Sequence, residues 1–131
     1  MIESETKTST PFSIERRAGK APGTVVFCFN GAFTAREMLA SLSPNDLSEM
    51  LYPASTPGGA APELQIFDLA GVPYLDSSGL GMIARHCVHC QNQGVRFVIA
   101  GASPRVRELF RITRMDTVIP LAVTAEQAES L

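Results

Sequence analysis

Two kinds of hydrophobic pattern alternate along the chain. Short runs rich in valine, isoleucine and phenylalanine, bounded by glycine, proline or asparagine, are typical of buried β-strands. They predict strands at Phe12–Arg17, Thr24–Asn30, Leu64–Leu69 and Phe97–Ala100, and a short final strand at Val118–Leu121. Only the segment "AGKAPG" separates the first two runs, so these two strands are expected to form a β-hairpin.

Other segments carry apolar residues at every third or fourth position, the spacing of one face of an α-helix. They predict helices at Ala35–Leu42 and Ser43–Leu51, from Asp76 to Gly94, from Ser103 onwards, and at Thr124–Leu131. Thr34 and Glu37 have the spacing of a capping box, in which each side chain accepts a hydrogen bond from a free backbone N–H of the first turn. The segment from Tyr52 to Pro62 is rich in proline and glycine and predicts a loop.

Strands that alternate with helices predict an α/β fold with a mostly parallel sheet, in which each helix crosses over from one strand to the next. In such a sheet the functional loops gather at the carboxyl ends of the strands. The segment "PYLDSSGLG" at Pro73–Gly81 follows the strand Leu64–Leu69 at this end. We therefore expect this segment to carry the function.

Composition limits the domain organisation and the class of protein. A chain of 131 residues, of which 45% are hydrophobic, fits one packed domain. We expect residues 1–11, which are polar, to form a flexible tail, and residues 12–131 to form the domain. The net charge of −2 without a basic stripe argues against a nucleic-acid partner.

The chain also lacks the sequence features of membrane and secreted proteins. No apolar run approaches the roughly 18 residues of a membrane-spanning helix, so no membrane association is expected. The N-terminus is polar and does not resemble a secretory signal. Three cysteines, an odd number, are consistent with reduced thiols. A cytoplasmic location is the expectation.

The serines of "PYLDSSGLG" have two plausible roles at the start of a helix. Ser77 can cap the helix, or it can accept a phosphate, because the first-turn amides and the helix dipole stabilise an anion there. Gly79 and Gly81 would leave the first turn open to another protein's active site. Asp76 can act as a base, as a cap, or as a charge that repels a phosphate on Ser77, and these roles stay open.

Serine catalysis within the chain is disfavoured. A hydrolase elbow requires glycine two residues before the serine, and here that residue is Leu75. The histidine at position 86 would lie about 13 Å from Ser77 along the helix axis, beyond hydrogen-bond reach. We do not expect Ser77 to be a catalytic nucleophile.

The segment "RHCVHCQ" superficially resembles a metal or thiol site. Cys87 and Cys90 continue the apolar stripe of the helix, which favours packing in the core, and His86 and His89 would then face solvent. A small metal- or thiol-dependent enzyme built on Cys87, Cys90 and His86 is the alternative of a different class. We expect no metal and no cofactor.

The motifs around Asp76 also carry a family resemblance. "FDLAGVPYLDSSGLGMIARHC", followed by "GVRFVIAGASPRVRELFRITRMDTVIPL", resembles the STAS domain of bacterial anti-sigma factor antagonists. The similarity covers about Leu64–Leu121. It implies a single STAS-type domain with a mixed, mostly parallel sheet of four to five strands and crossover helices packed mainly on one face.

The resemblance also implies a function without catalysis. Such domains bind a kinase-type anti-sigma factor in a partner switch that regulates transcription. That anti-sigma factor serine kinase uses ATP to phosphorylate the serine after the motif's aspartate, and a serine/threonine phosphatase resets the switch. Carried over, the acceptor is Ser77. The partner-binding residues implied around it are Asp76, Ser78, Gly79, Leu80, Gly81 and Thr34.

Two residues depart from the family pattern. Thr34 stands where family members often carry an aspartate that contributes to partner recognition, and Arg114 stands at a position that is usually glycine. The alternative within the same fold is a scaffold or sensory subunit that is not phosphorylated. If the chain self-associates, we expect a weak homodimer.

Overall fold

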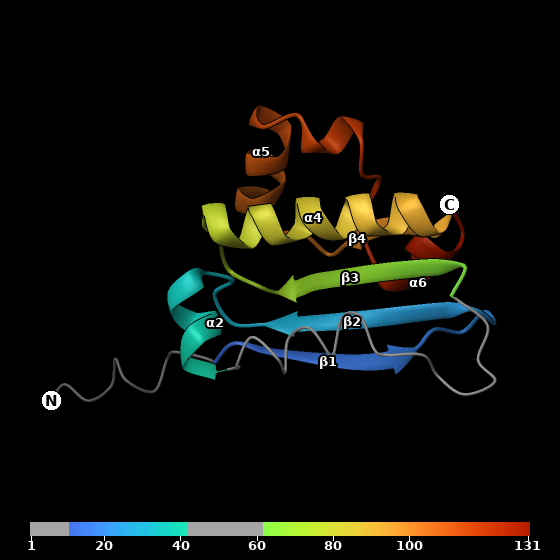
Figure 1. Ribbon diagram of the computed structural model, residues 1–131, viewed down its shortest axis with the longest axis horizontal. Coiled ribbons are helices and arrows are strands. Elements are labelled where there is room, and N and C mark those ends of the chain that lie inside the picture. The colour runs from blue at the N-terminus through green and yellow to red at the C-terminus, as the bar shows by residue number, and fades with distance from the viewer. Residues whose placement is uncertain (1–10, 42–61) are drawn as a thin grey trace, which may run out of the picture.

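The computed structural model describes residues 11–41 and 62–131, which form an α/β domain around one five-stranded sheet (Figure 1). The strands are β1 (Ser13–Ala18), β2 (Thr24–Asn30), β3 (Leu64–Gly71), β4 (Arg96–Ala100) and β5 (Leu121–Ala122). The helices are α2 (Ala35–Ser41), α4 (Ser77–Gln93), α5 (Pro104–Ile112), the 3-10 helix η1 (Met115–Thr117) and α6 (Ala125–Glu129). The strand order follows the sequence, with β1 antiparallel to β2 and the remaining pairs parallel.

Most predicted elements are confirmed, because their signals are local. Gly94 ends α4 in the left-handed conformation, with φ of 70°. Ser103 and Thr124 cap α5 and α6, each accepting a hydrogen bond from the backbone N–H three residues on. Three predicted segments lie outside the described residues: the helix Ser43–Leu51, the loop Tyr52–Pro62 except Pro62, and the tail at 1–11 except Pro11.

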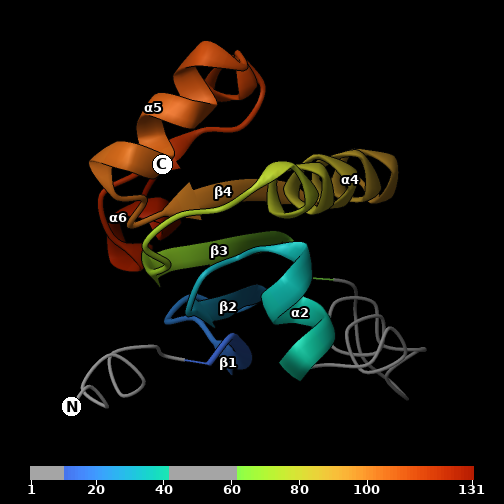
Figure 2. The same cartoon turned by 90° about the vertical axis from the view of Figure 1, so that its left-hand side faces the viewer.

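Two apolar layers cover the sheet. Figure 2 shows α2 and α4 on one face and α6 on the other. On the face that carries α2 and α4, the side chains of Phe27, Phe67 and Phe97 pack with buried residues of α4 and α5. On the opposite face a smaller cluster joins alternate strand residues to Ala125 and Ala128 of α6. The helices therefore lie mainly on one face of the sheet, as predicted.

The prediction that His86 faces solvent is wrong. Its side chain is fully buried, stacks on the ring of Phe67 at 4.6 Å and lies 2.5 Å from the Gln65 side-chain oxygen. Gln65 projects from β3 toward α4 and offers the imidazole a polar partner inside an aromatic layer. The prediction that Cys87 and Cys90 pack in the core is confirmed, because both side chains are buried in the same apolar cluster.

The predicted strand Val118–Leu121 is also wrong in its bounds, since β5 begins at Leu121. The preceding residues form η1 and a loop that contains Pro120, and proline has no N–H to donate to a strand ladder. Arg114 adopts φ of 62° just before η1. This left-handed conformation explains why glycine suits that position.

No helix of residues 11–41 and 62–131 has the length and apolar character needed to cross a membrane.

Candidate functional site at the start of helix α4

The candidate site lies where the loop after β3 meets the loop after β2. The Phe33 N–H donates to the Tyr74 carbonyl at 3.0 Å, and the Asp76 N–H donates to the Phe33 carbonyl at 3.3 Å. Phe33 and Leu75 thereby form an isolated parallel bridge, and both side chains are buried. The two loops continue the parallel pairing of their strands, which fixes the starts of α2 and α4 beside each other.

Asp76 joins the two helices through its carboxylate. Its Oδ1 accepts hydrogen bonds from the N–H groups of Ser78 and Gly79, both at 3.0 Å, at the start of α4. Its Oδ2 accepts the Ala35 N–H of α2 at 3.2 Å. Asp76 is therefore the cap of α4, one of the roles that the residues alone left open.

The electrostatics of Asp76 follow from these bonds. Partial burial opposes ionisation, but the hydrogen bonds from the Gly79, Ala35 and Ser78 N–H groups outweigh it and lower the pKa of the carboxyl below its usual value. The site thus holds a fixed negative charge beside Ser77.

Ser77 is the first residue of α4 and not its cap. Ser77 and Ser78 occupy the first two helical positions, and both are exposed to solvent. The Asp76 carboxylate already accepts the N–H groups of Ser78 and Gly79, so the Ser77 hydroxyl is not needed to cap the helix. An exposed hydroxyl at the positive end of a helix dipole is open to modification by an external enzyme.

The two glycines of the segment differ in their surroundings. A Cβ atom at Gly79 would lie 2.3 Å from the Phe33 carbonyl oxygen, so a side chain there would push the two loops apart. A Cβ atom at Gly81 would meet nothing within 4 Å. Leu80, between them, is half-buried against the core. Gly79 therefore serves the packing of the two loops, and Gly81 leaves the exposed face of α4 bare.

Thr34 caps α2 next to this site. Its hydroxyl accepts the Glu37 N–H at 3.2 Å, which is one half of the predicted capping box. The neighbouring N–H of Ala35 is bonded by Asp76. Thr34 is half-buried and lies within the same junction as Ser77.

Sequence reasoning missed one exposed pair in this region. The guanidinium of Arg105 lies 5.0 Å from the centre of the Tyr74 ring, and Tyr74 keeps 40% of its surface exposed. Arg105 is the second residue of α5, at the carboxyl end of β4, and so reaches the loop that carries Ser77. The sequence could have indicated this pair, because Arg105 follows the strand next to β3. The carboxyl ends of neighbouring parallel strands lie at the same edge of the sheet.

The cysteines offer poor chemistry for an enzyme. Burial, with a smaller contribution from Cys87, raises the pKa of Cys90 to about 12, and burial also raises the pKa of Cys87. Both thiols are therefore held protonated, the unreactive form. Within the described ranges, no three His, Cys, Asp or Glu side chains gather closely enough to hold a metal ion.

Comparison with known proteins places this geometry in a family. The STAS domain family model matches residues 14–128. A solved anti-sigma factor antagonist from Mycobacterium paratuberculosis is 21% identical with a TM-score of 0.65, and the match covers 93% of this chain and 96% of that one. The Bacillus cell fate determinant SpoIIAA in its phosphorylated form is 19% identical with a TM-score of 0.61, covering 91% and 96%.

The same fold occurs in a protein of another kind. A sulfate transporter family protein from Wolinella succinogenes is 17% identical with a TM-score of 0.66, and the match covers 82% of this chain and 83% of that one. At these identities the structural matches show a shared fold.

Proposed function

Because the chain belongs to the STAS domain family, we propose that it is an anti-sigma factor antagonist whose partner switch is controlled by phosphorylation of Ser77. In this proposal it has no catalytic activity of its own. Unphosphorylated, it binds a kinase-type anti-sigma factor and releases the sigma factor. The kinase then transfers the γ-phosphate of ATP to the Ser77 hydroxyl, and a phosphatase removes it.

The observation that carries the proposal is the position of Ser77. It is exposed at the first position of α4, and its cap role has been taken over by Asp76. The existence of a phosphorylated form of SpoIIAA, which shares this fold, supports the same modification here.

Electrostatics explain how a phosphate would end the interaction without unfolding the domain. A phosphoserine adds about −1.5 to −2 charge, which the helix dipole favours by roughly 0.3–1 kcal/mol. Asp76 beside it is already ionised, so the new charge creates a concentrated anionic point on the surface. A partner that docks closely here would face repulsion and the cost of desolvating that charge.

The proposed contact surface has an exposed part and a supporting part. Ser77, Ser78 and Gly81 are exposed, and Leu80, Asp76 and Thr34 are half-buried around them. Gly79 is buried and contributes by holding the loops together. Since Thr34 replaces the family's usual aspartate, the partner of this chain is expected to lack a cation at the matching point.

Intact mass spectrometry tests the proposal. The full chain is incubated with the anti-sigma kinase of the same organism and ATP, alongside the matched variants Ser77→Ala and Ser78→Ala. We expect the mass of one phosphate to be gained by the natural chain and by Ser78→Ala, and not by Ser77→Ala. A gain that persists in Ser77→Ala would refute the site.

A second candidate is a scaffold or sensory subunit that is never phosphorylated. This alternative is supported by the sulfate transporter family protein, which shares the fold. It would be supported if the kinase bound the chain but transferred no phosphate to any residue.

A further inference from the structure

The outer edge of β4 is only partly covered. Strand β5 pairs with β4 at two positions, Ile99 with Leu121 and Ala100 with Ala122. The preceding half of β4, from Arg96 to Val98, has no strand beside it on that side in the described part of the chain. An uncovered strand edge presents backbone donors and acceptors that can pair with another chain.

Phe97 is the residue whose backbone faces this open edge. Successive residues of a strand direct their N–H and C=O groups to opposite sides. The Arg96 N–H donates to the Glu63 carbonyl at 3.0 Å, toward β3, and the Ile99 N–H donates to the Pro120 carbonyl at 3.0 Å, toward β5. The N–H and C=O of Phe97 therefore point outward like those of Ile99, and no described residue bonds to either.

Pro120 is the reason that the chain does not close this edge itself. Extending the β4–β5 register by two residues would place Ile119 opposite Phe97. That pairing needs an N–H at position 120 to donate to the Phe97 carbonyl, and proline has none. The Ile119 N–H instead bonds to the Met115 carbonyl at 3.0 Å, and the Ile119 side chain enters the core.

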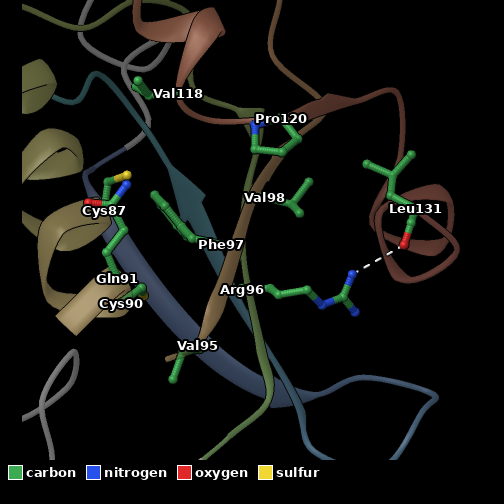
Figure 3. Close-up of a pocket in the computed structure, with 10 residues that line it drawn as sticks. All are labelled: Cys87, Cys90, Gln91, Val95, Arg96, Phe97, Val98, Val118, Pro120 and Leu131. Atoms are coloured by element: carbon green, nitrogen blue, oxygen red, sulfur yellow. Dashed lines mark hydrogen bonds between the residues drawn. The ribbon is translucent and has the colours of Figure 1, made fainter. Parts of the chain in front are cut away.

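A groove of about 360 Å³ lies along this edge (Figure 3). Phe97, Cys87 and Cys90 line it on the α4 side of β4, and Val98, Arg96 and Leu131 line it on the other side. The lining side chains thus lie on both faces of the strand edge, where Phe97 and Cys90 belong to one apolar layer and Val98 belongs to the other. Its lining is mainly apolar, and Val118 and Leu131 at the groove are 58% and 57% exposed.

We propose that this groove binds an extended, apolar segment of another protein by strand addition at Phe97. An outward N–H and C=O on one residue are complementary to the C=O and N–H of one residue in an extended chain. The apolar lining suits the side chains of such a segment, and exposed valine and leucine at the groove would be covered by it. The one charged lining side chain, Arg96, already donates to the Leu131 carbonyl at 3.1 Å, so the segment needs no acidic residue.

This site is distinct from the candidate site at Ser77. Cys87 follows Ser77 by ten residues on α4, which is about 15 Å along the helix axis. In Figure 1 the first turn of α4 adjoins α2, and its last turn lies at the opposite end of the helix, away from α2. A second protein could therefore occupy the groove while the first turn of α4 stays free.

Nuclear magnetic resonance of the ¹⁵N-labelled full chain tests the proposal. The probe is the peptide acetyl-Lys-Val-Leu-Val-Lys-amide, and its control carries an N-methyl group on the leucine nitrogen. The two peptides have equal side chains, but the control cannot donate from its central residue, whose N–H meets the Phe97 carbonyl when the peptide is centred on Phe97. We expect saturable movement of the Phe97 amide signal at millimolar peptide, and at least tenfold weaker binding of the control.

Two variants extend the test. Pro120→Val restores the missing donor, so β5 should lengthen over Phe97, protect its amide from hydrogen exchange and abolish peptide binding. Ser77→Asp should bind the peptide as the natural chain does, which separates this site from the proposed function.

Three outcomes would overturn strand addition. One is equal binding of the N-methyl peptide, and another is an unmoved Phe97 signal at millimolar peptide. The third is binding of butylbenzene, a purely apolar probe, at the lining methyl groups while neither peptide binds, which would assign the groove to a small molecule.

Discussion

The two halves of helix α4 hold their polar groups in opposite ways. At its start, the Asp76 carboxylate accepts three backbone N–H groups and leaves Ser77 and Ser78 exposed. In its second half, His86 is fully buried and bonds to Gln65 among aromatic rings. The half that is rich in histidine and cysteine is thus structural, and the half with plain serines is accessible. The intrinsic reactivity of a side-chain type therefore does not reveal whether that side chain is accessible.

Removal of the His86 side chain should have the largest effect on stability. His86→Ala leaves a cavity in the aromatic layer and leaves the buried Gln65 oxygen with the weaker bond from the Cys90 thiol at 3.6 Å. We expect a loss of about 3 kcal/mol in the free energy of unfolding, measured by urea denaturation. Val88→Ala on the exposed face of the same helix is the control, with a change of at most about 0.5 kcal/mol. A small effect of His86→Ala would show that the second half of α4 is not rigidly packed.

Acid should weaken the same half of the helix. Burial, with a smaller contribution from His89, lowers the pKa of His86 from its usual 6.5 to about 4. Between these two values the unfolded chain binds a proton that the folded chain does not, so stability falls as the pH falls from 6.5 to about 4. Above 6.5 the contribution is fully present, and the whole loss is about 3 kcal/mol.

The variant His86→Met isolates this contribution, because methionine fills much of the space and does not titrate. Urea denaturation at several pH values across this window should give the natural chain a steeper loss of stability than His86→Met. Equal slopes for the two proteins would mean that His86 has the same pKa in the folded and unfolded states.

Loss of the shared cap should come next in size. Asp76→Ala removes the acceptor for both α4 and α2 at once, and we expect about 2 kcal/mol of destabilisation. Asp76→Asn should lose about half as much, since one amide oxygen can still accept the Ser78 and Gly79 N–H groups. Thermal unfolding of the three proteins measures this order. An equal loss in both variants would show that the bonds to Ser78 and Gly79 contribute nothing, and that the bond to Ala35 and the negative charge carry the whole effect.

Sequence reasoning worked where the determining contacts are local. The caps Ser103 and Thr124 act within three residues of themselves, and Gly94 ends α4 through its own backbone conformation. The burial of His86 depends on Gln65, 21 residues earlier on another strand, and no pattern along α4 reveals that partner.

The candidate site shows the same division. Asp76 reaches Ala35 across 41 residues, so its double role needed the three-dimensional structure. The exposure of Ser77 followed from the helix start, which the sequence placed within one residue. The partner contacts at Ser78, Leu80, Gly81 and Thr34 stay predictions, because they depend on a second protein.

A negative charge at the exposed end should have the smallest effect on the fold. Ser77→Asp puts a carboxylate at the first position of α4, where the helix dipole favours it and Asp76 repels it, so stability should change by at most about 0.5 kcal/mol. Binding to the anti-sigma kinase, measured by calorimetry, should nevertheless weaken at least tenfold, because the charge lies on the proposed contact surface. Ser77→Asn is the matched neutral control and should bind more tightly than Ser77→Asp. If the two variants bound the kinase equally, charge at the start of α4 could not be what switches the partner.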